Sequence, residues 1–487
     1  MTDASSLRRE AEQILRHGQT EAAIQAYQRL LRLMPDGALD WYNLGYLQRI
    51  SRQFEEAVSS YRIAIARGIE RPEEVRLNIA VILSEHLNDV TAAKAELQVA
   101  LAENRSFIPG LLNLGNLCED IGDADGARAA YARVLLISPH NGRAISRLAA
   151  IEVFEGNGAS ALPGLRSALA QVPATSNDAA EISFAMGQAL DASGDYDGAF
   201  EAFEQANRIA RAVADPRRFY DRTRHEGLIE SIVRAWPGPG ADLPQEGDAS
   251  PLFILGLFRS GSTLAEGILC RHSLVTSGGE LDLLPALVAD KLQPFPFAAA
   301  SAPKDLLERI RSAYLGGIRH LFPDAGLLTD KRPDNFLYVG LIKSLFPDAR
   351  IVHSVRTPLD NILSIFFLHF DESQSHAFAL EDIAHWYVQY RRLMTHWQSI
   401  HPGEIFDFNY DRVVQDARSE VARLLRFCDL PWEESCLSEG VGTTPVRTPS
   451  AWQVRKPLHA RSSGRWRNYG KHLGQARAIL EQAGFDS

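Results

Sequence analysis

The sequence predicts an all-helical repeat array in its first half, followed by an α/β domain with a central parallel sheet. Small and aromatic residues recur at fixed offsets within residues 4–215, and such self-similarity is typical of helical repeats. Beyond Ser250, short apolar runs alternate with helical segments, and this alternation indicates parallel strands joined by crossover helices. The first apolar run leads directly into a loop that contains two spaced glycines.

The length of the chain predicts more than one domain, because 487 residues exceed what a single hydrophobic core usually organises. We assign the repeat array to residues 4–215 and the α/β domain to residues 250–487. Residues 216–249 contain a proline- and glycine-rich run from Trp236 to Gly240. This composition predicts a linker between the two domains.

Three segments of the first domain share one pattern, in which a glycine precedes an alanine and then an aromatic residue at constant offsets. The three sets are Gly45, Ala57 and Tyr61; Gly115, Ala127 and Tyr131; and Gly187, Ala199 and Phe203. The small residues let two antiparallel helices approach closely, and the aromatic ring fills the groove beside them. The pattern resembles the tetratricopeptide repeat, a helix–turn–helix unit, and predicts roughly five or six units.

The residues of the repeat pattern are expected to pack in the core of the array rather than to bind a ligand. An array of this kind implies a protein or peptide partner on its concave face. The same surface can equally serve for homodimerisation, and the sequence alone leaves both uses open.

Composition excludes several classes of function. The net charge of −10 argues against a broad nucleic-acid-binding face, which needs excess positive charge. The four cysteines form no CxxC pair, which favours reduced structural thiols and no metal site. The N-terminal residues are polar and no long apolar run occurs. We therefore expect no signal peptide, no membrane span and a cytoplasmic location.

The loop from Gly256 to Thr263 has the Gly-x4-Gly spacing of a nucleotide phosphate loop. Backbone N–H groups in such a loop, together with the following helix N-terminus, form a seat for an anion. The lysine that normally follows the second glycine, and that serves a γ-phosphate, is replaced by Ser262. A cation lies inside the loop instead, at Arg259. The loop is therefore expected to bind a terminal mono-anionic ester, which argues against a kinase or ATPase.

Together with Gly279-Glu280-Leu281, the segment Phe258–Leu264 resembles sulfotransferases that use 3′-phosphoadenosine 5′-phosphosulfate (PAPS). The resemblance is closest to tyrosylprotein sulfotransferases and to bacterial repeat-containing sulfotransferases, and it covers most of residues 250–470. It implies an α/β P-loop-type sulfotransferase domain behind a tetratricopeptide array. The further motifs that carry it are Thr329–Pro333, Val355–Pro358 with Ser364, Trp452–Pro457, and the Arg-x-x-Gly-x-Trp pattern of Arg461–Trp466.

The resemblance also implies catalytic roles. Glu280 is the expected general base, although the family has two adjacent glutamates and Gly279 stands in place of the first. Lys331 is expected to act as an acid or an electrostatic clamp on the bridging oxygen. Arg259 is expected to bind the 5′-phosphosulfate and to stabilise the transition state. His353, which lies on an apolar run, is expected to be a core histidine.

The remaining residues implied by the resemblance would bind the PAPS co-substrate without a metal ion. Those at the 5′-phosphosulfate are Ser260, Gly261, Ser262 and Thr263. Those at the 3′-phosphate are Arg356, Ser364 and Arg461, with Tyr410 and Trp466 near the adenosine. Gly464 belongs to the same C-terminal motif, and Ser450 and Lys456 would add further donors.

Three functions stay open on the sequence. The first is sulfuryl transfer to a hydroxyl acceptor, either a protein tyrosine or a small-molecule, glycan or lipid hydroxyl. The second is a repeat scaffold with a non-catalytic nucleotide-binding domain, against which the retained Arg259, Glu280 and Arg356 argue. The third is a kinase, which the missing loop lysine disfavours.

Overall fold

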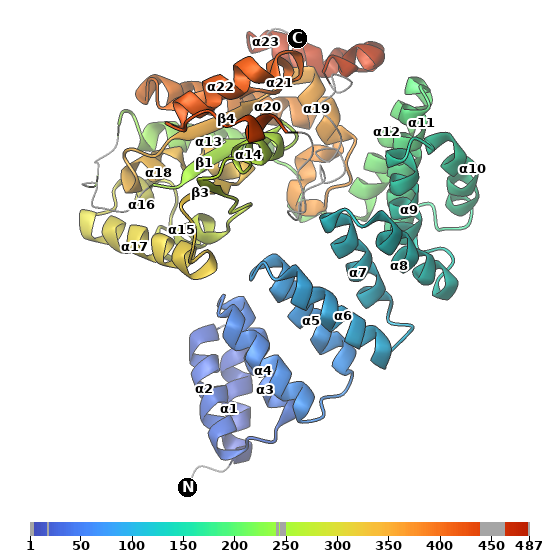
Figure 1. Cartoon of the computed structure of the whole chain (residues 1–487), viewed down its shortest axis with the longest axis vertical. Coiled ribbons are helices and arrows are strands. Elements are labelled where there is room, and N and C mark those ends of the chain that lie inside the picture. Colours follow the sequence, from blue (N-terminus) through green and yellow to red (C-terminus); the bar gives the residue numbers. More distant parts are fainter. Residues whose placement is uncertain (1–3, 17–18, 240–242, 244–249, 439–462, 486–487) are drawn as a thin grey trace. The chain divides into compact units, whose positions relative to one another are not determined.

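The structure is a computed structural model that describes residues 4–16, 19–239, 243, 250–438 and 463–485 (Figure 1). The chain divides into two compact units, residues 1–144 and residues 145–487. The first unit is entirely helical over its described residues. The second unit contains further helices and a five-stranded sheet.

The first unit consists of helices that pack as antiparallel pairs, α1 with α2, α3 with α4, α5 with α6, and α7 with α8. Its elements are α1 (Ala4–Arg16), α2 (Thr20–Leu33), α3 (Ala38–Ile50), α4 (Phe54–Ala66), α5 (Pro72–Glu85), α6 (Val90–Glu103), α7 (Ile108–Ile121) and α8 (Ala124–Ile137). A methyl group at Gly115 would lie 2.4 Å from the Tyr131 ring. The close helix approach predicted from the repeat pattern is therefore confirmed.

The second unit begins within α9 (Gly142–Phe154) and continues through α10 (Gly158–Leu169), α11 (Asn177–Ala192) and α12 (Tyr196–Val213). A methyl group at Gly187 of α11 would lie 2.7 Å from the Phe203 ring of α12. This helix pair thus repeats the contact seen between Gly115 and Tyr131. It shares one hydrophobic core with the α/β part of the unit.

Residues 216–249, expected as a linker, contain the short helix η1 (Pro216–Arg218) and α13 (Arg222–Ala235). Helix α13 packs against α20 (Leu380–Ile400). The Trp236 ring, directly after α13, makes an edge-to-face contact with Trp397, with ring centroids 5.9 Å apart. The described part of this stretch therefore belongs to the core of the second unit.

The sheet is parallel throughout, with the strand order β2-β3-β1-β4-β5. Its strands are β1 (Leu252–Gly256), β2 (Val275–Thr276), β3 (Leu327–Lys331), β4 (Ile351–Val355) and β5 (Ile405–Asn409). In register, Ile254 of β1 lies opposite Lys331 of β3, and Gly256 lies opposite Ser354 of β4. The carboxyl ends of all five strands consequently meet at one edge.

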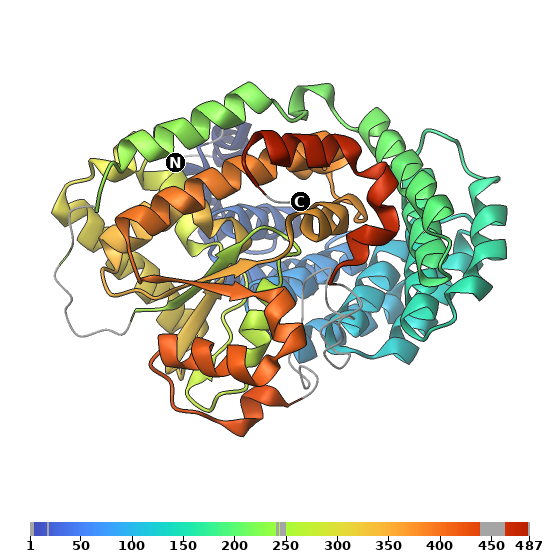
Figure 2. The same cartoon turned by 90° about the horizontal axis from the view of Figure 1, so that it is seen from above.

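Helices cover both faces of the sheet (Figure 2). Side chains of β1 alternate between two cores: Phe253 and Leu255 join α12, α13, α17 to α20 and α23, whereas Leu252 and Ile254 join α14 and α22. The α-helices not yet given bounds are α14 (Ser262–Leu269), α15 (Leu283–Lys291), α16 (Phe297–Ala300), α17 (Lys304–Leu321), α18 (Val339–Leu345), α19 (Pro358–Phe366), α21 (Tyr410–Gln415), α22 (Ala417–Phe427) and α23 (Gly474–Gln482). Short 3₁₀ segments are η2 (Pro333–Tyr338), η3 (Glu372–Phe378), η4 (Glu434–Leu437) and η6 (Arg465–His472). The predicted fold class, a helical repeat array followed by an α/β domain with a parallel sheet, is confirmed.

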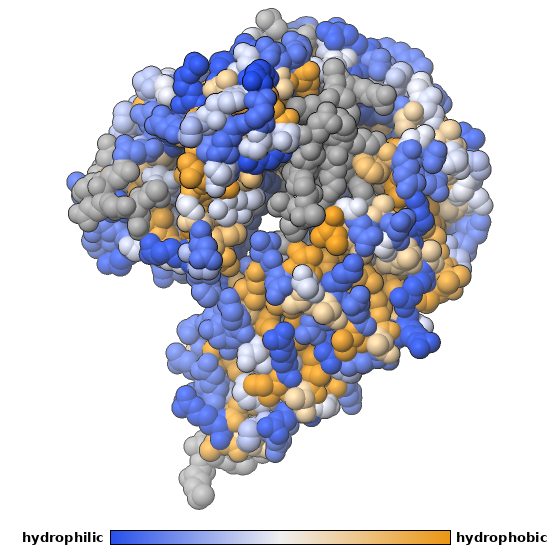
Figure 3. All heavy atoms as spheres, in the orientation of Figure 1, coloured by the Kyte–Doolittle hydropathy of each residue, from blue (hydrophilic) through white to orange (hydrophobic). Residues whose placement is uncertain are grey.

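The surface of the first unit mixes apolar and polar residues (Figure 3). Large apolar side chains are exposed there, among them Leu136, which is 85% exposed, and Leu33 and Leu39. Among the helices that the structure describes, none has the length and apolar character needed to cross a membrane.

Candidate functional site

The residues predicted to bind a ligand follow the carboxyl ends of the parallel strands. The glycine loop follows β1, Lys331 is the last residue of β3, Arg356 directly follows β4, and Tyr410 directly follows β5. Ligands of open α/β sheets bind in the crevice at this edge. The topology therefore brings together residues that are far apart in the sequence.

The loop after β1 has the backbone of an anion-binding turn. Gly256, Arg259 and Gly261 have positive φ angles of 145°, 68° and 109°. The Leu257 carbonyl accepts hydrogen bonds from the Ser260 backbone N–H at 3.1 Å and from the Ser260 hydroxyl at 2.7 Å. Since α14 begins at Ser262, the loop ends at a helix N-terminus whose N–H groups attract anions.

Two guanidinium groups lie at this loop. The Arg259 Nε donates to the Ser364 hydroxyl at 3.1 Å, and the Arg356 Nη1 lies 3.4 Å from the Arg259 carbonyl oxygen, to which it donates. Burial, and then the positive charges of Arg356 and Arg465, lower the pKa of Arg259 to about 10. Burial also lowers the pKa of Arg356. An anion bound between these groups would offset their mutual repulsion.

Tyr410 and Ser354 form the next part of the site. The Arg356 guanidinium lies over the Tyr410 ring, 4.9 Å from its centroid, a cation–π arrangement. A methyl group at Gly261 would lie 3.1 Å from Tyr410 and 3.4 Å from the Ser354 hydroxyl. That hydroxyl is buried and makes no hydrogen bond within the described part of the chain. A buried hydroxyl without a partner is costly and fits a ligand oxygen at this position.

Sequence reasoning missed Ser354 and Asn361. Ser354 precedes Arg356 by two positions, so the strand period places both on one side of the sheet. Asn361, buried on α19, donates from Nδ2 to the Phe258 carbonyl at 2.8 Å. It precedes Ser364 by three residues, so one face of a helix carries both. These two periodicities are the signals that could have identified them.

Glu280 and Lys331 form an ion pair at the same edge. The Lys331 Nζ lies 2.7 Å from the Glu280 Oε1. The lysine side chain is only 3% exposed, whereas the Glu280 side chain is 39% exposed. The lysine is thus buried beside the Glu280 carboxylate, which reaches solvent, where an incoming molecule can contact it.

Glu266 of α14 fixes the turn that leads to Glu280. Its Oε1 accepts hydrogen bonds from the Ser277 hydroxyl at 3.1 Å, the Gly279 N–H at 3.0 Å and the Thr329 hydroxyl at 2.8 Å. The Gly279 carbonyl in turn accepts from the Lys331 N–H at 2.9 Å. Glu266 was not predicted, since a glutamate inside a helix gives no signal of such contacts.

The described part of the C-terminal motif lies beside α19. The buried Asp360 carboxylate accepts from the Gly464 N–H at 2.6 Å and from the Trp466 N–H at 2.8 Å. Burial raises the pKa of Asp360. The structure thus brings Gly464 and Trp466 to the helix that carries Ser364. Ser450, Lys456 and Arg461 lie outside the described residues.

His353 lies in the core, as predicted, and is 1% exposed. Its Nδ1 lies 2.6 Å from the Asp407 Oδ1, and its Nε2 contacts the Tyr390 hydroxyl. Burial lowers the pKa of His353. Within the described ranges, no group of three or more histidine, cysteine or acidic side chains is arranged to hold a metal ion.

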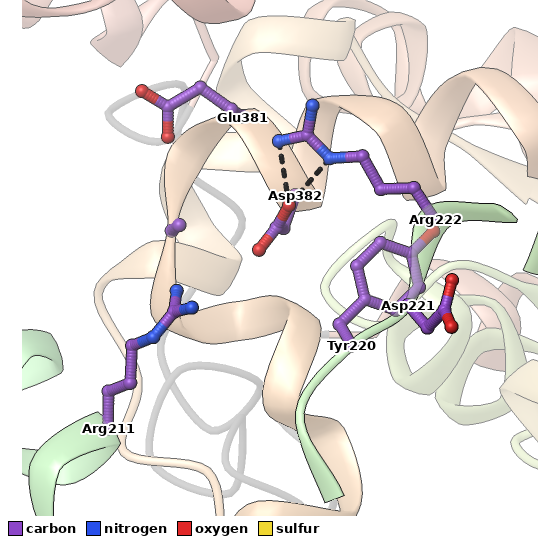
Figure 4. Close-up of a pocket in the computed structure, with 7 residues that line it drawn as sticks. Arg211, Tyr220, Asp221, Arg222, Glu381 and Asp382 are labelled. Atoms are coloured by element: carbon purple, nitrogen blue, oxygen red, sulfur yellow. Dashed lines mark hydrogen bonds and ion pairs between the residues drawn. The ribbon is translucent and has the colours of Figure 1, made fainter. Parts of the chain in front are cut away.

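A separate open pocket of about 640 Å³ lies where α12 and the start of α13 meet the start of α20 (Figure 4). It is lined by Arg211, Tyr220, Asp221, Arg222, Ala379, Glu381 and Asp382. The Arg222 guanidinium points at Asp382, and their closest atoms are 2.7 Å apart. The lining contains none of the predicted site residues, so we do not assign the site to this pocket.

Comparison with protein families gives three matches. Residues 251–434 match the model of the sulfotransferase family. Residues 10–72 match one tetratricopeptide repeat model, and residues 108–141 and 180–213 match another. The α/β part of the chain is thus similar to the sulfotransferase family, and these segments of the helical part are similar to tetratricopeptide repeats.

Individual relatives are more distant or only partly covered. An uncharacterized protein of Aquifex aeolicus (strain VF5) is 30% identical over 388 residues, which span 76% of this chain and 50% of the relative. A sulfotransferase domain from the curacin biosynthetic pathway is 19% identical with a TM-score of 0.36, covering 50% of this chain and 99% of that domain. The tetratricopeptide protein YrrB, which has an unusual peptide-binding site, is 19% identical with a TM-score of 0.29, covering 41% and 92%. The chain spans about half the length of the curated relative that it matches.

Proposed function

We propose that this chain is a PAPS-dependent sulfotransferase that moves a sulfuryl group to a hydroxyl acceptor. One observation carries the proposal: a phosphate-type loop at the carboxyl edge of a parallel sheet contains Arg259, contacts Arg356, and has Ser262 where nucleotide kinases have lysine. The match of residues 251–434 to the sulfotransferase family supports it.

The residues of the loop would hold the 5′-phosphosulfate through backbone N–H groups and hydroxyls, with Arg259 at its negative charge. These are Arg259, Ser260, Gly261, Ser262 and Thr263. The 3′-phosphate would bind Arg356 and Ser364, with Arg461 as a further expected ligand. Tyr410, Gly464 and Trp466 would lie near the adenosine, and Ser450 and Lys456 stay as expected donors. The buried Ser354 hydroxyl by Gly261 makes no hydrogen bond within the described residues, which supports a bound anion beside the loop.

The reaction requires an in-line displacement at sulfur. The acceptor hydroxyl oxygen forms a bond to sulfur while the bond from sulfur to the phosphate oxygen breaks, and the products are a sulfate ester and 3′,5′-bisphosphoadenosine. Glu280 would take the hydroxyl proton, a role that contributes about 10²–10⁴-fold in other enzymes. Lys331 and Arg259 would stabilise the charge that develops on the leaving oxygen. The 2.7 Å contact between Lys331 and Glu280 supports the proposal that both residues act at the same reacting group.

For the acceptor, we propose a protein tyrosine, because the motifs around Arg259 and Glu280 resemble those of tyrosylprotein sulfotransferases. Tetratricopeptide repeats commonly bind proteins or peptides, and a protein acceptor would give the array a role in docking it. Small-molecule, glycan and lipid hydroxyls are the alternative acceptors, and a homodimer is the alternative use of the array.

The test is transfer of radiolabelled sulfate from PAPS to an acceptor panel that contains tyrosine peptides, simple phenols, glycans and a sterol. The proposal predicts label in at least one acceptor class with the wild-type chain, and a loss of at least about 100-fold in Glu280→Ala. Magnesium-dependent transfer of phosphate from ATP to the same panel, without sulfate transfer, would overturn it.

A further inference from the structure

The C-terminal segment, residues 463–472, connects the last repeat with the candidate nucleotide site. Its first residues are bound by Asp360 of α19. Two aspartates of the last repeat bind further groups of the segment: Asp191 of α11 binds Arg465 and Tyr469, and Asp197, in the first turn of α12, binds Lys471. All of these residues belong to one compact unit, residues 145–487.

Asp191 makes the more specific of the two repeat contacts. Its Oδ2 lies 2.6 Å from the Arg465 Nη2, and its Oδ1 accepts from the Arg465 Nε at 3.1 Å. The same Oδ1 accepts from the Tyr469 hydroxyl at 2.5 Å. The Asp191 and Arg465 side chains are only 18% and 27% exposed. A two-point contact between guanidinium and carboxylate fixes the orientation of both groups.

Apolar contacts extend this connection to α19. The Phe203 ring of α12 stacks on Phe367, directly after α19, with centroids 3.9 Å apart. Asn207 of α12 donates from Nδ2 to the Phe366 carbonyl at 2.9 Å. The Arg465 guanidinium also lies over the Phe367 ring, 5.0 Å from its centroid. The last repeat therefore supports both the C-terminal segment and the end of the helix that carries Asp360 and Ser364.

The position of Arg465 matters to the site because its charge reaches the two site guanidiniums. Arg465 is one of the groups that lower the pKa of Arg259, after burial and Arg356, and it acts on Arg356 in the same direction. Asp191 holds this third cation in one place. Without Asp191, Arg465 would be free to leave that position, and the Gly464 and Trp466 N–H groups would lose the support of the segment behind them.

We propose that Asp191 is a positioning residue of the nucleotide site, and that the last repeat, α11 with α12, is a constituent of that site. Asp191 fixes Arg465 and Tyr469, and through them the segment that Asp360 binds at Gly464 and Trp466. The inference rests on the proposed function, because the nucleotide is the bisphosphate part of PAPS. It goes beyond that function in giving the repeat array a role in binding the co-substrate.

The test compares two aspartates that hold the same segment. Asp197 contacts Lys471 at 2.7 Å and His472 at 3.0 Å, but its side chain is 56% exposed and its partners follow Gly464 by seven and eight residues in the sequence. Calorimetric titration of the full chain with 3′,5′-bisphosphoadenosine should show at least about tenfold weaker binding in Asp191→Asn. The matched control Asp197→Asn should bind within about twofold of the wild type.

A merely structural role for Asp191 would change the melting temperature without a selective effect on the nucleotide. Steady-state kinetics should show a raised KM for PAPS, with kcat near the wild-type value at saturating PAPS. Tyr469→Phe, which removes one hydroxyl and keeps the ring packed, should weaken bisphosphate binding in the same direction and serves if Asp191→Asn fails to fold.

Three results would overturn the inference: unchanged affinity in Asp191→Asn, equal losses in Asp191→Asn and Asp197→Asn, or unchanged affinity in Tyr469→Phe when Asp191→Asn does not fold. Failure of the proposed function gives a different result, because the wild-type chain itself would then not bind the bisphosphate.

Discussion

The Lys331 ammonium group lies 2.7 Å from the Glu280 carboxylate, although 51 residues separate them in the sequence. Lys331 ends β3, and Glu280 follows the turn after β2, the neighbouring strand. Parallel pairing of these two strands therefore puts the proposed base and the proposed cation side by side. The pair also keeps a buried ammonium group from being left without a countercharge, which would be costly.

Replacing Glu280 by glutamine should abolish most activity and leave nucleotide binding intact. The amide cannot accept the acceptor proton, so kcat should fall by about 10²–10⁴-fold, while the affinity for 3′,5′-bisphosphoadenosine should change by less than about twofold. The matched control is Asp282→Asn, a partly exposed acid two residues further along the chain that pairs with Arg332. An active Glu280→Gln variant would remove Glu280 from the role of base.

Glu266→Ala should reduce kcat because it releases the turn before Glu280. It would leave the donors of Ser277, Gly279 and Thr329 without this acceptor, and the loss costs about 1–3 kcal/mol at a buried group such as the Thr329 hydroxyl. Glu266→Gln keeps an acceptor oxygen and should retain most of both stability and rate. The measurements are kcat and the melting temperature of the two variants. Equal kcat values for Glu266→Ala and Glu266→Gln would contradict the positioning role of Glu266.

Tyr390→Phe should lower the stability of the protein, because it removes contacts that support the loop after β1. The Tyr390 hydroxyl contacts the His353 Nε2 and also the backbone of Leu257, the first loop residue after β1. Its removal leaves two buried polar groups unpartnered, so the free energy of unfolding should fall by about 1–3 kcal/mol. Tyr338→Phe, whose ring packs edge-on against Phe295, is the control. Equal denaturant midpoints for the two variants would count against the contact.

Asp330 should give the stability a measurable pH dependence. Burial raises its pKa from 3.8 to about 7, in spite of hydrogen bonds from Tyr314 and Asn335. Between these two values the unfolded chain has released a proton that the folded chain retains. This carboxyl therefore lowers the free energy of unfolding as pH rises from about 4 to 7, by up to about 1.4 kcal/mol per unit, with no further effect above 7.

Asp330→Asn removes that proton exchange. Relative to the wild type, the variant should gain stability steadily from pH 4 to pH 7 and then show a constant difference, as measured by urea unfolding at each pH. Asp348→Asn, on an exposed residue, should run parallel to the wild type throughout. A constant difference between Asp330→Asn and the wild type over the whole range would contradict the raised pKa.

Much of the fold was predictable because its signals are local. The offset from Gly115 to Tyr131 reports a helix contact within one repeat, and the loop around Arg259 follows its strand directly. Helix α13 also had a local signal, since the buried residues His225, Ile229 and Ile232 follow helical spacing. The proline- and glycine-rich run from Trp236 to Gly240 predicts a linker instead.

The residues that support the site from the last repeat were not predictable, because their contacts join distant segments. Asp191 and Arg465 are 274 residues apart, and neither has a neighbour in the sequence that points to the other. Ser354 differs, because the strand period places it on the same side of the sheet as Arg356. Only the packing of the last repeat against α19 and the C-terminal segment brings Asp191 and Arg465 together.

The most direct test of the central claim is a metal-free calorimetric titration with 3′,5′-bisphosphoadenosine and, separately, with ATP. The titrations compare the wild-type chain, Arg356→Ala and the control Arg418→Ala. Arg418 is an exposed arginine that is paired with Glu434. The account predicts tight bisphosphate binding, weaker ATP binding, and a loss of at least about tenfold in Arg356→Ala alone. Bisphosphate binding that is absent, or equal to ATP binding and unaffected by Arg356→Ala, would contradict it.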